Sequence, residues 1–168
     1  MNTILGRYGV VLLLAIYGVG LGCAGIRPYP RYPFRGDTRC GGRIAKCREK
    51  IEKVITAYLG TPYQWGGDSK DGLDCSGLVV VVFQQALGID LPHSTEGLFA
   101  MGYHVARKRW CFGDLLFFSE NGKRATHVGI FVGENRFVHA SEGQGVTISK
   151  FESPYFQQRY VGTRRLDL

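Results

Sequence analysis

The sequence predicts an α+β domain in which N-terminal helices pack on an antiparallel sheet of five to six strands. Two observations carry this prediction. Between residues 44 and 87, apolar residues recur every three or four positions or form one long run, as in helices. Beyond residue 113 the pattern changes to short β-type runs separated by glycine and asparagine turns. Helices followed by a meander of strands are typical of the α+β class.

An amphipathic helix is predicted over residues 44–59, because Gly60 and Pro62 would end it there. Its apolar face would be formed by Ile44, Cys47, Ile51, Val54, Ile55, Tyr58 and Leu59.

Residues 75–87 form a long apolar run that is predicted to be a buried helix. Asp74 is a suitable N-cap, since its carboxylate can accept hydrogen bonds from free amides of the first turn. Gly88 suits the left-handed conformation that often follows a helix. Four valines in a row would also fit a buried strand, but the length of the run and the two cap residues favour the helix.

Cys75 would lie in the first turn of this helix. The partial positive charge of a helix N-terminus favours a thiolate over a thiol, and the free amides can hold a developing oxyanion. The alternative is a small, buried, inert cysteine, which is what most free cysteines are.

The second half of the domain is predicted to be mostly strands. A turn at 91–95 leads at most into a short helix. The β-type runs after it are 114–118, 127–132, 136–140, 146–149 and 160–163.

Two histidines in neighbouring strands are candidates for a base and its orienting partner, because a cysteine nucleophile needs both. His127 opens one strand and His139 lies inside the next. A two-residue loop between the strands would place Ile130 opposite His139 and the histidines on opposite faces. A three-residue loop, residues 133–135, would place Gly129 opposite His139 and set both rings on one face, within reach of a hydrogen bond.

Residues 1–22 have the layout of a secretory signal, with basic Arg7, an apolar core and small residues after it. Cys23 directly after this segment resembles the cysteine of bacterial lipoprotein signals, which becomes the lipidated first residue. Ala24 behind it resembles an outer-membrane sorting signal. Lipoprotein signals usually have leucine where this chain has Gly20, so an uncleaved membrane anchor is the alternative.

Residues 23–43 are rich in proline and glycine and are predicted to be a tether, followed by one domain at 44–168. In an oxidising compartment Cys40 and Cys47 could form a disulfide, leaving Cys111 over, or they could both be free thiols.

The 168-residue chain has 21 basic and 14 acidic side chains and a formal net charge of +7. The surplus suits an anionic polymer or a membrane surface. It is spread along the chain without a dense basic run, so nucleic acid is not an expected partner.

Seven segments resemble the NlpC-type cell-wall cysteine peptidases, a papain-like α+β family. They are 60–67, 72–79, 91–92, 113–118, 126–133, 137–141 and 159–165, in the order of the family. Phe112 departs from the family, which usually has proline before the Gly-Asp pair.

The resemblance implies a Cys-His-His triad in which Cys75 is the nucleophile, His127 the base and His139 the residue that orients the base. In this interpretation a Cys75 thiolate pairs with a protonated His127. Tyr63 corresponds to a tyrosine that helps to hold the oxyanion. Trp65 is expected in the core.

Three more residues are assigned to the substrate site by resemblance. Asp74 and Ser76 fall where the family contacts the peptide stem of its substrate. His93 follows the position of a cleft-lining loop, where it could touch substrate.

The implied function is a peptidoglycan endopeptidase that hydrolyses amide bonds to meso-diaminopimelate, in stem peptides or in cross-links. No metal or organic cofactor is expected. The expected partners are the stem peptides and, through the lipid anchor on Cys23, the membrane. The protein would be a monomer on the outer membrane, facing the periplasm.

Two alternatives stay open. One is a related thiol amidase or acyltransferase acting on another amide or on a lipid. The other is a non-catalytic, wall-binding lipoprotein.

Overall fold

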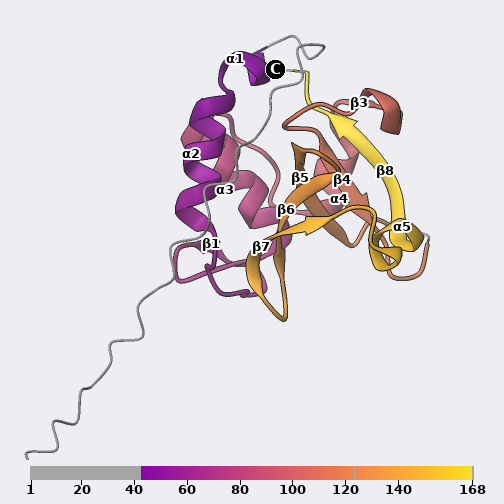
Figure 1. Cartoon of the computed structure of the whole chain (residues 1–168). Coiled ribbons are helices and arrows are strands. Elements are labelled where there is room, and N and C mark those ends of the chain that lie inside the picture. The colour runs from indigo at the N-terminus through magenta and orange to yellow at the C-terminus, as the bar shows by residue number, and fades with distance from the viewer. Residues whose placement is uncertain (1–42, 123, 168) are drawn as a thin grey trace, which may run out of the picture.

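The computed structural model of the protein describes residues 43–122 and 124–167. The predicted signal at 1–22, the predicted lipidation site Cys23 and the predicted tether up to residue 42 lie outside the described residues, whereas the last tether residue, Arg43, begins a helix. Helices α2 (Arg48–Tyr58) and α3 (Cys75–Leu87) pack together beside a six-stranded antiparallel sheet (Figure 1). This is the papain-like α+β arrangement that was predicted. Among the described residues, no helix has both the length and the apolar composition needed to cross a membrane.

The N-terminal helical segment is divided in two. Helix α1 covers Arg43–Lys46 and α2 covers Arg48–Tyr58, so the single helix predicted over 44–59 is interrupted at Cys47. The backbone of Cys47 has φ −101° and ψ 9°, away from helical values, and its amide is shared between two carbonyls of α1 at 2.9 and 3.1 Å. Helix α2 keeps the predicted apolar face, with Ile51, Ile55 and Tyr58 buried.

Helix α3 covers Cys75–Leu87 and has the predicted caps at both ends. The carboxylate of Asp74 accepts a hydrogen bond from the Gly77 amide at 2.7 Å, and Gly88 after the helix has φ 66°. Nine of the 13 residues of α3 are buried, which explains why its apolar pattern is nearly continuous. The strand alternative is wrong.

The main sheet has the strand order β3-β8-β4-β5-β6-β7, with every neighbouring pair antiparallel. Its strands are β3 (Tyr103–His104), β4 (Leu115–Phe118), β5 (His127–Gly133), β6 (Arg136–Ser141), β7 (Gly145–Lys150) and β8 (Tyr160–Arg165). Five of the six strands were predicted, and β3 is too short for a detectable alternation.

Smaller elements surround the sheet. Strands β1 (Asp68–Ser69) and β2 (Gly72–Leu73) pair with each other ahead of α3. The predicted short helix after the 91–95 turn is α4 (Thr95–Ala100), capped by the hydroxyl of Ser94. A 3-10 turn at Arg107–Arg109 and helix α5 (Pro154–Arg159) were not predicted.

Alternate residues of the strands separate two hydrophobic cores. Leu115 and Phe117 of β4 face the core shared with α2 and α3, whereas Leu116 and Phe118 face an aromatic core. The aromatic core consists of Val105, Trp110, Leu116, Phe118, Phe131, Phe137 and Phe151.

The β5–β6 hairpin has a two-residue turn and a β-bulge. Glu134 and Asn135 have φ 51° and 54°, the left-handed conformation that a tight hairpin turn requires. Gly133 pairs with Arg136 beside this turn, and the register then shifts by one residue. The hairpin thus has the turn of the two-residue alternative and the register of the three-residue alternative, because a bulge produces the shift.

The shifted register sets both histidines on one face of the sheet. Ile130 pairs with Val138, which sets Gly129 opposite His139 and places His127 on the same face. Only glycine fits opposite His139, since a Cβ on Gly129 would lie 2.8 Å from the carbonyl of Val138 and 3.2 Å from the Cβ of His139.

The structure decides between the two alternatives for Cys47. Cys47 and Cys75 are free, which excludes the bridge between Cys40 and Cys47, while Cys40 itself lies outside the described residues. Cys111, which the bridged alternative left over, is disulfide-bonded. Cys47 lies at the junction between α1 and α2.

A buried ion pair joins the start of β4 to the end of β8. Arg165 donates to Asp114 from Nε at 2.7 Å and from Nη2 at 2.8 Å, and the Cys111 amide donates to the same carboxylate at 2.7 Å. The side chain of Asp114 is only 1% exposed, so the carboxylate depends on these donors instead of water.

Arg165→Met should lower the free energy of unfolding by about 3 kcal/mol or more, because it leaves the buried carboxylate of Asp114 without its counter-ion. Urea denaturation followed by circular dichroism measures this loss. Arg124→Met removes the exposed pair with Glu96 and should cost less than about 1 kcal/mol. Equal losses in the two variants would contradict this account of the β4–β8 pair.

Candidate active site

A cavity of about 890 Å³ opens at the N-terminal end of α3, beside the starts of β5 and α4 and the end of β6. All seven residues predicted for the catalytic and substrate site line it: Tyr63, Asp74, Cys75, Ser76, His93, His127 and His139. The fold thus brings together side chains from segments that are far apart in the chain.

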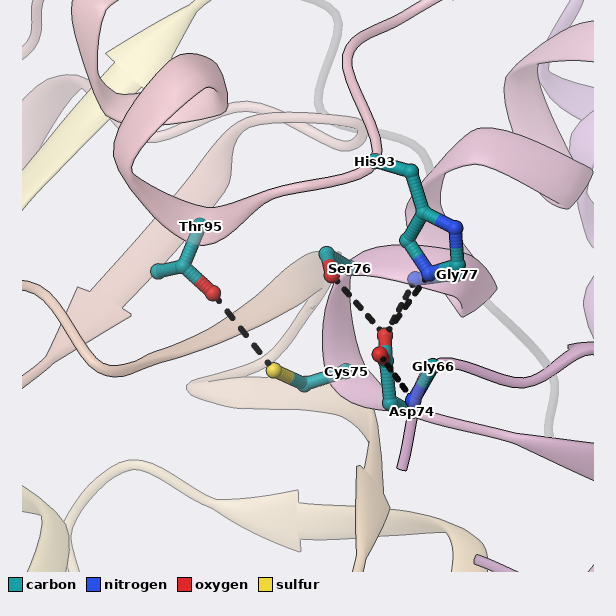
Figure 2. Close-up of polar contacts among 7 residues, drawn as sticks. All are labelled: Gly66, Asp74, Cys75, Ser76, Gly77, His93 and Thr95. Carbon is teal, nitrogen blue, oxygen red and sulfur yellow. Dashed lines mark hydrogen bonds and ion pairs between the residues drawn. The ribbon is translucent and has the colours of Figure 1, made fainter. Parts of the chain in front are cut away.

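Cys75 begins α3 and is 8% exposed. Its Sγ lies 3.6 Å from Oγ1 of Thr95, the first residue of α4 (Figure 2). Burial raises the pKa of the Cys75 thiol, and hydrogen bonds from Thr95 and the Val128 amide only partly oppose this effect. The negative charge of Asp74 raises the same pKa further.

The two histidines form a short hydrogen-bonded chain with Ser149. Nε2 of His127 lies 2.8 Å from Nδ1 of His139, whose Nε2 lies 2.9 Å from Oγ of Ser149. The ring of His139 packs against Phe137 and Phe156, with centroid distances of 4.9 and 5.4 Å. Burial lowers the pKa of His127 to about 4, and burial together with the charge of His127 lowers the pKa of His139 to about 3.

These shifts correct the expected thiolate–imidazolium pair. A raised pKa of Cys75 and a lowered pKa of His127 mean that the resting site holds a neutral thiol and a neutral imidazole. The helix N-terminus alone was expected to favour the thiolate. Burial outweighs it, because a low-dielectric environment disfavours the charged form of both groups.

The carboxylate of Asp74 accepts four hydrogen bonds (Figure 2). Its Oδ1 accepts from the Gly77 amide at 2.7 Å, the Ser76 hydroxyl at 2.8 Å and Nε2 of His93 at 3.2 Å, and its Oδ2 accepts from the Gly66 amide at 2.9 Å. Burial raises the pKa of Asp74, but these hydrogen bonds outweigh it and leave the pKa below its ordinary value. Asp74 therefore carries a full negative charge beside the nucleophile.

Tyr63 lies in the wall of the cavity next to Cys75. Burial raises the pKa of the Tyr63 hydroxyl, and electrostatic interactions with Cys75, Glu142 and Asp74 raise it further. The hydroxyl therefore keeps its proton and can donate it to a hydrogen bond.

The opening of the cavity is aromatic and charged. Trp65 is 85% exposed and lines the opening, so the prediction that it lies in the core is wrong. Gly66, with φ 71°, turns its own amide inward to Asp74 while Trp65 stays outside. Glu120, Glu142 and Arg159 also line the cavity. Within residues 43–122 and 124–167, no group of three histidine, cysteine or acidic side chains is arranged to hold a metal ion.

Three contacts in this region were not predicted. Thr95 approaches Cys75, and His93 binds Asp74. For this segment the sequence predicted only a turn, and the family resemblance only a possible contact of His93 with substrate. Ser149 reaches His139 from β7. Aligning β7 against β6 from the turn between these two strands could have identified Ser149 as a neighbour of His139.

Comparison with known proteins agrees with this geometry. The NlpC/P60 family matches residues 60–165. The chain is 46% identical over 136 residues to the Gamma-DL-glutamyl hydrolase of Bacillus subtilis (strain 168), which covers 80% of this chain and 33% of that protein. It is 44% identical over 124 residues to the Murein DD-endopeptidase MepS/Murein LD-carboxypeptidase of Escherichia coli (strain K12), which covers 74% of this chain and 65% of that protein.

A solved structure gives the same result in three dimensions. The NlpC/p60 domain of peptidoglycan hydrolase SagA superposes with a TM-score of 0.62 at 29% identity, covering 70% of this chain and 97% of that one. The capped helix, the cavity-lining cysteine and both histidines lie within the matched residues 60–165. The chain belongs to the NlpC/P60 family.

Proposed function

We propose that this protein is a cysteine endopeptidase that cleaves peptide bonds of peptidoglycan. The observation that carries the proposal is that Cys75, at the N-terminus of a buried helix, lines the same cavity as the hydrogen-bonded pair His127 and His139. A nucleophile, a base and a group that orients the base are what amide hydrolysis by covalent catalysis requires. The names of the two relatives, a glutamyl hydrolase and a murein endopeptidase, support the same class of reaction.

The reaction begins from the neutral pair. Sγ of Cys75 attacks the carbonyl carbon of the substrate while its proton passes to Nδ1 of His127, because Nε2 of that ring faces His139. The new carbon–sulfur bond leaves a tetrahedral oxyanion. Amides of the first turn of α3 and the hydroxyl of Tyr63 stabilise this charge.

The second half of the reaction regenerates the thiol. The carbon–nitrogen bond breaks, and the leaving amine takes the proton from His127. A water molecule then adds to the thioester with His127 as base, which releases the carboxylic acid product and the Cys75 thiol. His139 accepts a hydrogen bond from His127 throughout and so keeps the ring oriented.

The finer features of substrate and location are part of this proposal. Asp74 and Ser76 contact the stem peptide, and the cleaved bond involves meso-diaminopimelate, either after γ-D-glutamate or at a cross-link. The protein acts as a monomer without a cofactor. A lipid on Cys23 anchors it in the cell envelope, at the outer membrane.

Cys75→Ala should reduce the release of muropeptides from purified peptidoglycan by a factor of about 10⁴ or more, as loss of a nucleophile does in other triads. Mass spectrometry of the new amino termini in the wild-type digest identifies the cleaved bond. Cys47→Ser changes a free thiol outside the cavity and should retain activity. Release by Cys75→Ala at the wild-type rate would refute the mechanism, and cleavage of a lipid amide instead of peptidoglycan would favour the acyltransferase alternative.

The pH dependence of iodoacetamide alkylation tests the neutral resting pair. Alkylation of Cys75 should be slow near neutral pH and rise as the pH approaches the raised pKa of the thiol, whereas an ion pair would react at a constant rate from acidic pH upward. Thr95→Val removes a hydrogen bond to the thiolate and should move the profile about one pH unit higher. Thr95→Ser keeps the hydroxyl and is the control, and a profile unchanged in Thr95→Val would exclude this role.

His139→Ala should lower the rate of muropeptide release by roughly two to four orders of magnitude, because the His127 ring loses the group that fixes its tautomer. His139→Asn and His139→Gln should lose less, since an amide oxygen can accept the same hydrogen bond. Initial rates on purified peptidoglycan measure the series. Full activity in His139→Ala would mean that another residue orients His127.

A further inference from the structure

Ser149 lies behind the histidine pair, on β7 and outside the lining of the cavity. In the strand register His139 pairs with Thr147 and Phe137 pairs with Ser149, so the Ser149 hydroxyl reaches His139 diagonally. Because it does not line the cavity, Ser149 can influence Cys75 only through His139 and His127.

Only one arrangement of hydrogens in this chain leaves a base facing Cys75. Each neutral ring carries one N–H, and each of the two short contacts holds one hydrogen. If Ser149 accepts from Nε2–H of His139, then Nδ1 of His139 accepts from Nε2–H of His127, and Nδ1 of His127 is free to take a proton. If Ser149 donates instead, every hydrogen reverses, and Nδ1 of His127 already carries a proton.

We propose that Ser149 is a positioning residue whose hydroxyl accepts a hydrogen bond from His139 and thereby selects the productive tautomer of both histidines. This inference rests on the proposed nucleophilic role of Cys75. It extends the chain to four members: Cys75, His127, His139 and Ser149.

The need for an acceptor is greatest when His127 is protonated during the reaction. Both nitrogens of His127 are then donors, so His139 must accept at Nδ1 and donate at Nε2. Ser149 provides the acceptor for that last hydrogen. His139 is 4% exposed and packs against Phe137 and Phe156, so its ring is held with Nε2 aimed at the Ser149 hydroxyl.

Nitrogen-15 NMR of the full-length protein, labelled at histidine, tests the proposal without a substrate. In the wild type, Nδ1 of both His127 and His139 should have the chemical shift of an unprotonated ring nitrogen, and both Nε2 atoms that of a protonated one. The reversed assignment in the wild type would overturn the proposal, whether or not any variant folds.

Variants at position 149 give the second test. Ser149→Ala should populate the reversed tautomers, and Ser149→Thr, which keeps the hydroxyl, should restore the wild-type signals. Thr147→Ala removes a hydroxyl from the same face of β7 and should change neither the signals nor the activity. Wild-type tautomers and a wild-type rate in Ser149→Ala would overturn the proposal.

Activity links the tautomers to the reaction. Ser149→Ala should lower kcat for muropeptide release about 10- to 100-fold with little change in KM. The lost acceptor stabilises the protonated His127 that forms during the reaction, and it does not line the substrate cavity. The NMR experiment does not depend on which bond is cleaved. The expected tautomers in a protein that does not digest peptidoglycan would therefore refute the proposed function while supporting the assignment of Ser149.

Discussion

One buried carboxylate, that of Asp74, holds together the parts of the chain that meet at the site. It caps α3 and binds the Gly66 amide and the ring of His93, so a single charge fixes the helix terminus against two loops. There is no spare room in this arrangement: a Cβ on Gly77 would collide with the carbonyl of Gly67 and lie 2.9 Å from Nε2 of His93. Cys75 follows Asp74 directly, so the cap determines where the thiol is held.

Burial then determines the charge of the site. The thiol and both imidazoles are withdrawn from water, and each remains neutral at rest. In the proposed mechanism, charge appears only while bonds are forming. The groups that stabilise it are already in position, because the helix amides and the hydroxyl of Tyr63 belong to the folded wall of the cavity.

The sequence predicted most of the fold, because its signals are local. The apolar run between Asp74 and Gly88 specified α3 with both caps, and short β-type runs between turn residues specified five strands of the sheet. The break at Cys47 and the exposure of Trp65 had no such local signal, since both depend on how distant segments pack.

The residues of the candidate site could be predicted from the sequence, but their protonation states could not. Resemblance and strand alternation indicated Cys75, His127 and His139, and the structure places them on one cavity. The neutral thiol could not be predicted from a helix terminus alone, because the opposing effect is desolvation by the folded chain. The contacts of Thr95 and Ser149 likewise arise from tertiary packing.

The bulge in the β5–β6 hairpin determines which face of the sheet His139 occupies. Since successive side chains of a strand point to opposite faces, the extra residue beside Gly133 is what turns His139 toward His127. A hairpin of this length with the same two-residue turn and no bulge would instead pair Ile130 with His139 and carry the imidazole of His139 into the opposite core. The face that His139 occupies is therefore set by one irregularity in β5, and a substitution that abolishes the bulge would separate the two imidazoles while leaving the turn itself intact.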